Sequence, residues 1–237
     1  FRALRFSARL GFNIDYDTLS AIEDNAYLAD ELAPERVHEE LEKILLTSRP
    51  DTMSAVISFG LLKKYIPGAG WKMPDFSAIA DMQKKALPRW AAFSIMLNKY
   101  GYIPSVEEFL HALRLDGRTI RVCEAASEML SSPVPADKLG WKKALCKYGV
   151  DAVSCAAAAY DTINGSNCEK ELKAVLKSGE CFSVKHLAIS GDDLLSLGLR
   201  GRELGEMLNF LLDYVMEYPD NNKREILLAL AKDSEES

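Results

Sequence analysis

The sequence contains few of the residues that build disulfide frameworks and metal centres. Its five cysteines are an odd number, lie far apart and include no Cys-x-x-Cys pair, which argues against a zinc site and indicates reduced thiols. None of its three histidines belongs to a His-Asp pair or a His-Glu-x-x-His motif, so a metal-dependent phosphohydrolase would lack its ligands. His38 lies in a charged helical segment and is expected to be exposed. No metal site is predicted.

Long apolar runs and catalytic signatures are absent as well. No apolar run is long enough to cross a membrane, so no membrane partner is predicted. The reduced thiols favour a cytoplasmic location. The sequence has no G-x-G-x-x-G, no P-loop and no G-x-S-x-G elbow. Acidic pairs such as Asp192-Asp193 fall at expected helix starts, where capping explains them better than acid–base catalysis. By its residues alone the chain is a helical binding or scaffold module with no catalytic residue.

The net charge of −6 argues against a sequence-independent nucleic-acid binder, whose affinity comes from neutralising phosphates. It leaves room for a local basic face, because basic residues gather at several places. The ordinary interpretation of each cluster is a solvated helix face. The clusters are Lys63-Lys64, Lys84-Lys85 with Arg89, Arg114 with Arg118 and Arg121, and Lys142-Lys143 with Lys147.

The apolar periodicity is helical almost throughout, and the fold is predicted to be all-α. Gly11 should end the first helix, Asp17 or Thr18 should cap the second, and Pro34 should start the third. Residues 67–71, Pro-Gly-Ala-Gly-Trp, are the best candidate for a linker. Further helices are predicted over 87–99, 105–113, 118–130, 138–147, 150–161, 169–177 and 203–216, and Asn221 or Asn222 should cap a last one.

The first twelve residues already have a helical pattern, without a starting methionine or a capping residue, so we expect a piece of a longer protein. Arg2, Arg5 and Arg9 recur at spacings of three and four, which places them along one helical face.

Three motifs resemble those of the class II tRNA nucleotidyltransferase and bacterial poly(A) polymerase family. The segment RALRFSARLGF at 2–12 is similar to the end of the family's nucleotide-reading helix, E-D-x-x-R-x-x-R-x-x-R-F, with Arg2 and Arg5 as its last two arginines. The segment ERVHEEL at 35–41 resembles the signature E-R-x-x-x-E-L. The segment GDDL at 191–194, followed by three spaced glycines, is similar to the family's C-terminal pattern.

The resemblance implies an all-α array of neck (1–66), body (67–150) and tail (151–237), with a catalytic head before the first residue. That head would carry the aspartates and their two Mg²⁺ ions, so the chain alone is predicted to be inactive. Arg2 and Arg5 are implied to face the nucleotide, with pairing to neck carboxylates as the alternative. Glu35 and Arg36 are implied to steady the neck beside the nucleotide-reading helix.

Body and tail are implied to bind tRNA through phosphates and shape. Backbone N–H groups near Gly201 could hold a phosphate, although a plain helix start explains the same turn. The acidic end at 233–237 replaces the basic extension that is usual in poly(A) polymerases and favours tRNA as substrate. The candidate RNA contacts are Arg114, Arg118, Arg121, Arg200, Gly201 and Arg202.

The predicted function is the helical part of a bacterial enzyme that adds CCA to tRNA 3′ ends from CTP and ATP. Within the family the alternatives are a CC-adding enzyme, an A-adding enzyme and a poly(A) polymerase. Outside it the alternative is a stand-alone helical RNA-binding or scaffold protein. The sequence makes no prediction of oligomeric state.

Overall fold

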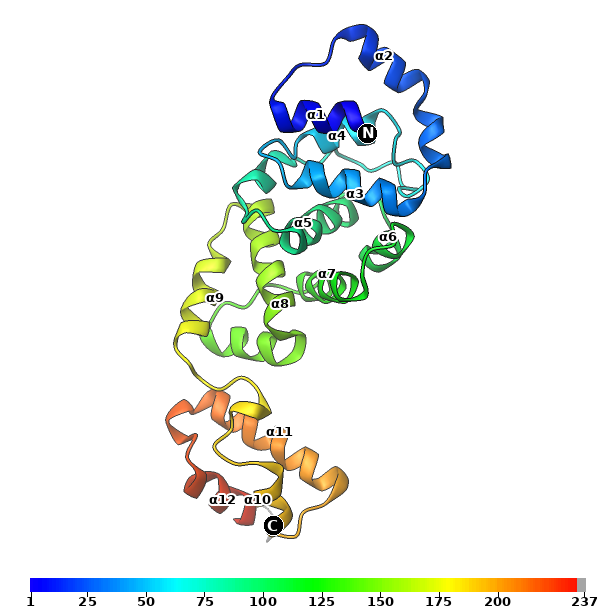
Figure 1. Ribbon diagram of the computed structural model, residues 1–237. Helices are drawn as coiled ribbons and strands as arrows, with labels where there is room; N and C mark the ends of the chain where they lie inside the picture. The colour runs from blue at the N-terminus through cyan, green and yellow to red at the C-terminus, as the bar shows by residue number, and fades with distance from the viewer. Residues whose placement is uncertain (234–237) are drawn as a thin grey trace. The chain divides into compact units, whose positions relative to one another are not determined.

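The computed structural model describes residues 1–233, and every regular element in that range is a helix (Figure 1). The prediction of an all-α fold is confirmed. The end of the acidic segment, residues 234–237, lies outside the described residues. Within the described part, no helix combines the length and the apolar character that a membrane span needs.

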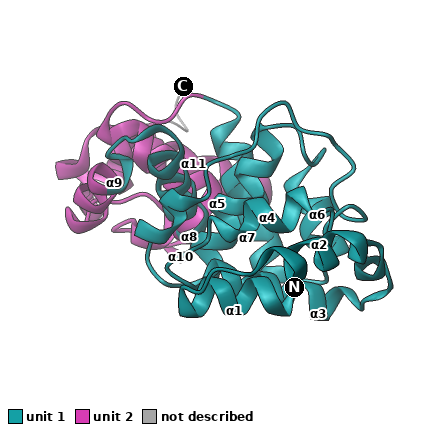
Figure 2. Cartoon of the chain, turned by 90° about the horizontal axis from the view of Figure 1, so that it is seen from above, with its two compact units in different colours: residues 1–132, 151–169 teal, residues 133–150, 170–237 magenta. Residues whose placement is uncertain are grey.

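The chain divides into two compact units, coloured separately in Figure 2. Unit 1 consists of residues 1–132 and 151–169, and unit 2 consists of residues 133–150 and 170–237. The division into neck, body and tail stays a prediction.

The helices follow in chain order. The α-helices are α1 (Arg2–Leu10), α2 (Tyr16–Asp24), α3 (Pro34–Leu45), α4 (Thr52–Ser58), α5 (Ala86–Lys99), α6 (Val106–Ala112), α7 (Gly117–Leu130), α8 (Lys138–Asn164), α9 (Cys168–Lys177), α10 (Gly191–Ser196), α11 (Gly201–Glu217) and α12 (Arg224–Asp233). The short 3-10 helices are η1 (Ala26–Glu31), η2 (Ser77–Asp81), η3 (Val184–His186) and η4 (Pro219–Asn221).

Helix α5 forms the centre of unit 1. It is buried on all sides from Arg89 to Leu97 and contacts α3, α6 and α7. Phe93 lies at its middle, with its ring centroid 5.2 Å from that of Phe76 and 6.1 Å from that of Phe109. A helix that is apolar around its whole circumference is stable only inside a larger core, so α3, α6 and α7 are the surrounding layer.

Two predicted helix boundaries are confirmed and one is wrong. Gly11 ends α1 with φ 74°, a left-handed conformation that favours glycine. Pro34 is the first residue of α3. The cap of α2 is Asp15, whose carboxylate accepts the Thr18 N–H at 2.9 Å, so the predicted caps Asp17 and Thr18 lie inside the first turn.

The two helices predicted at 138–147 and 150–161 are present as the two parts of α8, separated by a break at Gly149. Gly149 has φ 80° and ψ 162°, which no α-helical residue adopts. The residues up to Val150 belong to unit 2, and those from Asp151 belong to unit 1. The glycine therefore stands at the border of the two units.

The glycine-rich segment at 67–71 is a packed turn inside unit 1. Gly68 donates its N–H to the Tyr102 carbonyl at 3.0 Å, and Trp71 donates to the Tyr100 carbonyl at 3.1 Å. A Cβ atom on Gly68 would lie 2.1 Å from the Gly101 oxygen, so the backbones meet at a distance that only glycine permits. The segment does not behave as a free linker.

Unit 2 has its own core, built mainly by α10, α11 and α12. Asn221 and Asn222, predicted to cap α12, use their side chains elsewhere. The Asn222 amide accepts the Ala188 N–H at 2.8 Å and donates to the His186 carbonyl at 2.9 Å, while Asn221 donates to the Tyr214 hydroxyl at 2.6 Å. Both side chains tie the connections of this unit to its core. The buried residues of that core are Cys181, Ile189, Leu194, Leu199, Leu211, Leu212, Val215, Met216, Leu227 and Ala231.

Candidate functional site

The two arginines predicted to face a nucleotide lie on α1 in different environments. Arg2 is exposed, whereas the Arg5 side chain is only 14% exposed. Both guanidinium groups lie over the Phe6 ring, at 5.6 Å for Arg2 and 4.4 Å for Arg5. Arg2 is therefore the one of the two that is open to a ligand from outside unit 1.

Arg5 forms an ion pair with Glu40 of α3, with 2.6 Å between Nε and Oε2. Burial raises the pKa of Glu40, but hydrogen bonds and charge from Arg5 and Lys43 outweigh it and hold that pKa below its ordinary value. Glu40 is the second glutamate of the E-R-x-x-x-E-L segment, so this contact joins two of the sequence motifs. Of the two roles expected for Arg5, the ion pair corresponds to the alternative one, pairing with a carboxylate of the predicted neck. Contact between Arg5 and a nucleotide stays a prediction.

Glu35 and Arg36 are exposed at the start of α3, and their steadying role stays a prediction. The buried anchors of the same segment are Val37 and Leu41, which are both fully buried. His38 is half-buried, and its Nδ1 lies 2.9 Å from the Leu113 carbonyl, so the expectation of an exposed histidine is wrong. A ring nitrogen held by a backbone carbonyl indicates a structural contact between α3 and the end of α6.

The three arginines around the start of α7 are all exposed. Asp116 caps the helix by accepting the N–H groups of Arg118 and Thr119. The Arg118 Nη2 lies 2.7 Å from the Asp151 Oδ2, and this hydrogen bond raises the pKa of Arg118. Arg114 adopts φ 58°, and neither it nor Arg121 has a carboxylate partner among the described residues. Of the three arginines, Arg114 and Arg121 are therefore the candidate RNA contacts whose guanidinium groups have no carboxylate partner among the described residues.

The second predicted RNA contact lies at the start of α11 in unit 2. Gly201 is the first helical residue and has φ 56°, while Arg200 stands before it without a side-chain cap on the helix. Arg202 pairs with Glu206 at 2.7 Å, with both side chains largely exposed. The first N–H groups of this 17-residue helix therefore have no side-chain partner from Arg200. Phosphate binding here stays a prediction.

Two of the predicted solvated basic clusters each contain one buried member. Arg89 is 2% exposed and is satisfied entirely by backbone carbonyls. Its five N–H donors reach Leu45, Thr47, Ala80, Met82 and Gln83 at 2.5–3.2 Å. Burial lowers the pKa of Arg89. The prediction of a solvated face fails here because the planar guanidinium can meet five acceptors at once.

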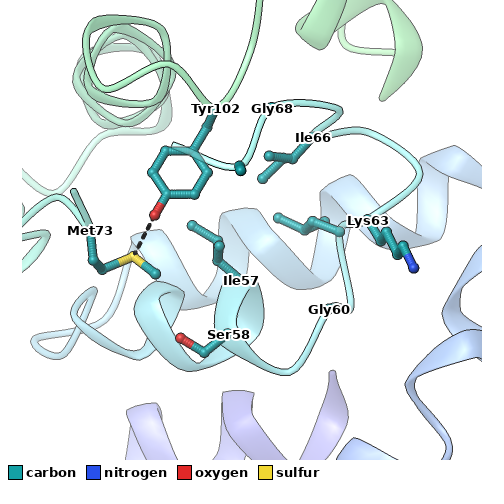
Figure 3. A pocket seen from close by; sticks show the side chains of 10 residues that line it. Ile57, Ser58, Gly60, Lys63, Ile66, Gly68, Met73 and Tyr102 are labelled. Atoms are coloured by element: carbon teal, nitrogen blue, oxygen red, sulfur yellow. Dashed lines mark hydrogen bonds between the residues drawn. The ribbon is translucent and has the colours of Figure 1, made fainter. Parts of the chain in front are cut away.

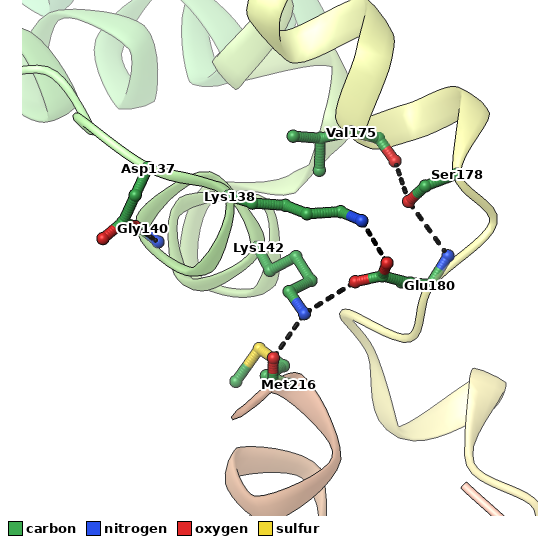
Figure 4. Close-up of polar contacts among 8 residues, drawn as sticks. All are labelled: Asp137, Lys138, Gly140, Lys142, Val175, Ser178, Glu180 and Met216. Atoms are coloured by element: carbon green, nitrogen blue, oxygen red, sulfur yellow. Dashed lines mark hydrogen bonds and ion pairs between the residues drawn. The ribbon is translucent and has the colours of Figure 1, made fainter. Parts of the chain in front are cut away.

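Lys142 is the buried cation of unit 2 (Figure 4). Its Nζ lies 2.9 Å from the Glu180 Oε2 and also donates to the Met216 carbonyl, at the end of α11. Lys138 reaches the other oxygen of Glu180. Burial raises the pKa of Glu180, but hydrogen bonds from Lys138 and Lys142 outweigh it and lower that pKa overall. These contacts join the first part of α8, the segment after α9 and the end of α11.

One pocket of unit 1 is largely apolar. A pocket of about 290 Å³ is lined by Ile57, Ile66, Met73 and Tyr102, with Lys63 at one side (Figure 3). The Tyr102 hydroxyl lies 3.8 Å from the Met73 sulfur, and no acid–base pair stands in the pocket. Within residues 1–233 no group of histidine, cysteine and carboxylate side chains could hold a metal ion.

The comparison with family models matches residues 11–71 to the "probable RNA and SrmB-binding site of polymerase A". The chain is 30% identical over 204 residues to a CCA-adding enzyme of Geobacillus sp. strain WCH70, which covers 82% of this chain and 48% of that enzyme. It is 25% identical over 236 residues to a CCA-adding enzyme of Levilactobacillus brevis, covering 98% of this chain and 59% of that enzyme. The chain thus spans about half the length of these relatives.

Among solved structures, the fold matches the crystal structure of the Bacillus stearothermophilus CCA-adding enzyme in complex with CTP. The TM-score is 0.75 at 21% identity, over 99% of this chain and 60% of that chain. At this identity the match concerns the fold alone, and it agrees with the all-helical architecture.

Proposed function

Because the chain is a class II CCA-adding enzyme-like protein by its sequence matches and its fold, we propose that it forms the helical part of a longer nucleotidyltransferase. The longer protein would add CCA to tRNA 3′ ends from CTP and ATP, with Mg²⁺ held outside this chain. The observation that carries the proposal is similarity to CCA-adding enzymes over 82–98% of the chain. The bacterial origin and the cytoplasmic location belong to the same proposal.

The role of this part would be to complete the nucleotide site with Arg2 and to bind tRNA. The exposed guanidinium of Arg2 and the separate basic groups at α7 and α11 support that division of labour. An arginine suits either target, because its planar fork donates two hydrogen bonds to a phosphate or a base edge.

The chain alone should transfer no nucleotide, since no group of three or more histidine, cysteine, aspartate or glutamate side chains within residues 1–233 could hold a metal ion. The test incubates the purified chain with Mg²⁺, labelled CTP or ATP, and tRNA lacking its CCA end. We expect no incorporation. Incorporation of C or A would overturn the assignment of the chemistry to another part of the protein.

The proposed RNA contacts at the start of α11 are tested by reversing the charge of two arginines there. Arg200→Glu with Arg202→Glu should weaken tRNA binding about tenfold or more, because bound counterions are released at each phosphate contact. The matched control, Lys177→Glu with Lys232→Glu, reverses two other exposed cations of unit 2. Binding that is insensitive to salt, or equally tight for an unstructured RNA of the same length, would favour the scaffold alternative.

The nucleotide role of Arg2 is tested in the longer protein. Arg2→Ala should lower nucleotide incorporation about ten- to a hundredfold, the loss of one charge-assisted contact, with little change in melting temperature. A lower melting temperature with unchanged kinetics would assign Arg2 a structural role. The products formed by the intact protein, CCA, CC, A or a long A tail, distinguish the members of the family.

A further inference from the structure

We propose that a basic pocket in unit 1, separate from the groups at α7 and α11, binds phosphate. The pocket of about 540 Å³ is bounded by α1, the end of α3 and the segment after η2. Its polar lining consists of Arg5, Arg9, Lys43, Thr47, Ser48 and Lys84. The inference rests on the proposed function and names a ligand chemistry for a place that this function does not assign.

The pocket has an excess of positive charge in a chain whose net charge is −6. Of its four cations, Arg5 and Lys43 share Glu40, and Lys43 also lies 3.4 Å from the exposed Glu39. Arg9 and Lys84 have no carboxylate partner among the described residues. Two cations are therefore available to a phosphate, beside two others that are already neutralised.

The end of a helix is ordinarily a poor place for an anion, because its free carbonyls carry partial negative charge. Here the buried Arg89 compensates the partial negative charge of these carbonyls. Its Nη1 donates to the carbonyls of Leu45 and Thr47, at the end of α3. The positive guanidinium thus occupies the acceptors that would otherwise repel a phosphate.

Arg89 also fixes the pocket's shape. Its Nη2 donates to Ala80 and Met82, and its Nε donates to Gln83, the residue before Lys84. One buried side chain therefore ties the end of α3 to the segment that carries Lys84. A pocket whose walls are held in this way loses little conformational entropy when a ligand binds.

The groups that would contact the ligand are few. The Thr47 hydroxyl already donates to the Ile44 carbonyl and accepts the Arg49 N–H, so it supplies shape and no further donor. Ser48 is exposed at the rim, where its hydroxyl can donate. Arg9, Lys84 and Ser48 together offer the charge and the hydrogen bonds that phosphoryl oxygens accept.

The ligand chemistry is a phosphoryl group, which an RNA backbone or a nucleoside triphosphate can supply. The test compares the whole chain with Arg9→Ala plus Lys84→Ala. The matched control, Lys72→Ala plus Lys99→Ala, also removes two exposed cations from unit 1. The probes are a tRNA transcript without CCA, ATP, and inorganic tripolyphosphate as a competitor.

With an RNA phosphate as ligand, the pocket variant weakens tRNA binding about tenfold or more and lowers the slope of log affinity against log salt by about one to two. With a triphosphate as ligand, the variant weakens ATP binding and leaves tRNA binding unchanged. Loss of either kind, together with competition by tripolyphosphate, supports the pocket. Equal affinities of pocket and control variants for all three probes would overturn it.

Two further measurements keep the outcome clear. Glu39→Gln removes a carboxylate beside Lys43 and should tighten phosphate binding; weaker binding would contradict the pocket. If the double variant loses helical circular dichroism, Arg9→Gln and Lys84→Gln are measured singly. A wild-type chain that binds tripolyphosphate and no tRNA refutes the proposed function and leaves the pocket standing. A chain that binds tRNA, and whose affinities for all three probes are unchanged by the pocket variant, refutes the pocket and leaves the proposed function standing.

Discussion

Unit 1 and unit 2 each bury one basic side chain within the described part, and they compensate its charge in different ways. Arg89 meets five backbone carbonyls and no carboxylate. Lys142 meets one carboxylate, Glu180, and one carbonyl, that of Met216. The guanidinium can do without a counter-charge because its five donors point in fixed directions, whereas the compact ammonium of lysine needs a nearby anion.

Because the two cations are compensated differently, removing Arg89 and removing the partner of Lys142 should destabilise their units for different reasons. Losing Arg89 leaves carbonyls of two chain segments without their donor inside unit 1. Losing Glu180 leaves an ammonium that is almost fully buried without its anion. The loss of Arg89 destabilises unit 1 through unpaired backbone carbonyls, which do not titrate, so its cost is independent of pH. The loss of Glu180 destabilises unit 2 through an unpaired charge, and the contribution of Glu180 depends on pH because its carboxyl group titrates.

The largest effect is expected for Arg89. Arg89→Met should lower the free energy of unfolding of unit 1 by about 4 kcal/mol, because several buried acceptors lose a charged donor together. Denaturant unfolding followed by Trp90, in a background with Trp71→Phe and Trp141→Phe, measures it. Arg89→Lys is the matched control and should restore only part of the loss. Full recovery with lysine would show that positive charge alone is enough and would remove the contrast between the units.

A smaller effect is expected for the ion pair of unit 2. Glu180→Gln should lower the free energy of unfolding by about 2–3 kcal/mol, since the glutamate side chain is 22% exposed and Lys142 is 3% exposed. Trp141, buried in unit 2, reports the transition with Trp71 and Trp90 replaced. The double variant Lys142→Met plus Glu180→Gln should regain much of the loss. A double variant as unstable as the sum of both singles would show that the pair is not coupled.

The units should also differ in acid. The folded pKa of Glu180 lies below its ordinary value of 4.5, so the stability that this group contributes is complete above the ordinary value and is lost as pH falls through the folded pKa. Unfolding of unit 2, followed by Trp141 from neutral pH down to about pH 3, should therefore be less pH-dependent in Glu180→Gln than in the wild type. An identical pH profile in both proteins would show that Glu180 does not contribute to the pH dependence of unfolding.

The smallest effect belongs to the pair between α1 and α3, which is intermediate between a surface pair and a buried one. Arg5 is 14% exposed and Glu40 is 23% exposed. Glu40→Gln should cost about 1 kcal/mol in the Trp90 assay, and the more exposed Glu39→Gln about 0.3 kcal/mol or less. Equal losses for the two variants would show that the burial of Arg5 and Glu40 adds nothing to their attraction.

Local signals predicted much of the fold. Pro34, Gly11 and the apolar stripe of α3 act through their immediate neighbours, so a single sequence displays them. The position of Asp15 as a cap was missed because Asp17 and Thr18 satisfy the same pattern two and three residues later. Asn222 looked like a cap, but its side chain reaches 36 residues back to His186, a contact that no local pattern contains.

The candidate site shows the same limit more strongly. Arg5 and Glu40 were both inside recognised motifs, but the sequence could not tell that they meet, since 35 residues separate them. Arg89 and Lys142 looked like members of solvated clusters because a cation on a helix is ordinarily exposed. Each is buried only because acceptors from distant segments surround it, and that arrangement exists only after folding.

The division of the chain into units has a consequence for its synthesis. The backbone passes from one unit to the other at 132–133, 150–151 and 169–170. On a ribosome, which delivers the amino end first, unit 1 must wait for residues 151–169, and by then the opening stretch of unit 2 has already emerged. No single cut in the backbone therefore separates the two units cleanly: a cut at 169–170 keeps unit 1 whole but leaves residues 133–150 of unit 2 attached to it. An expression plasmid for unit 1 alone would need residues 132 and 151 joined by a new loop.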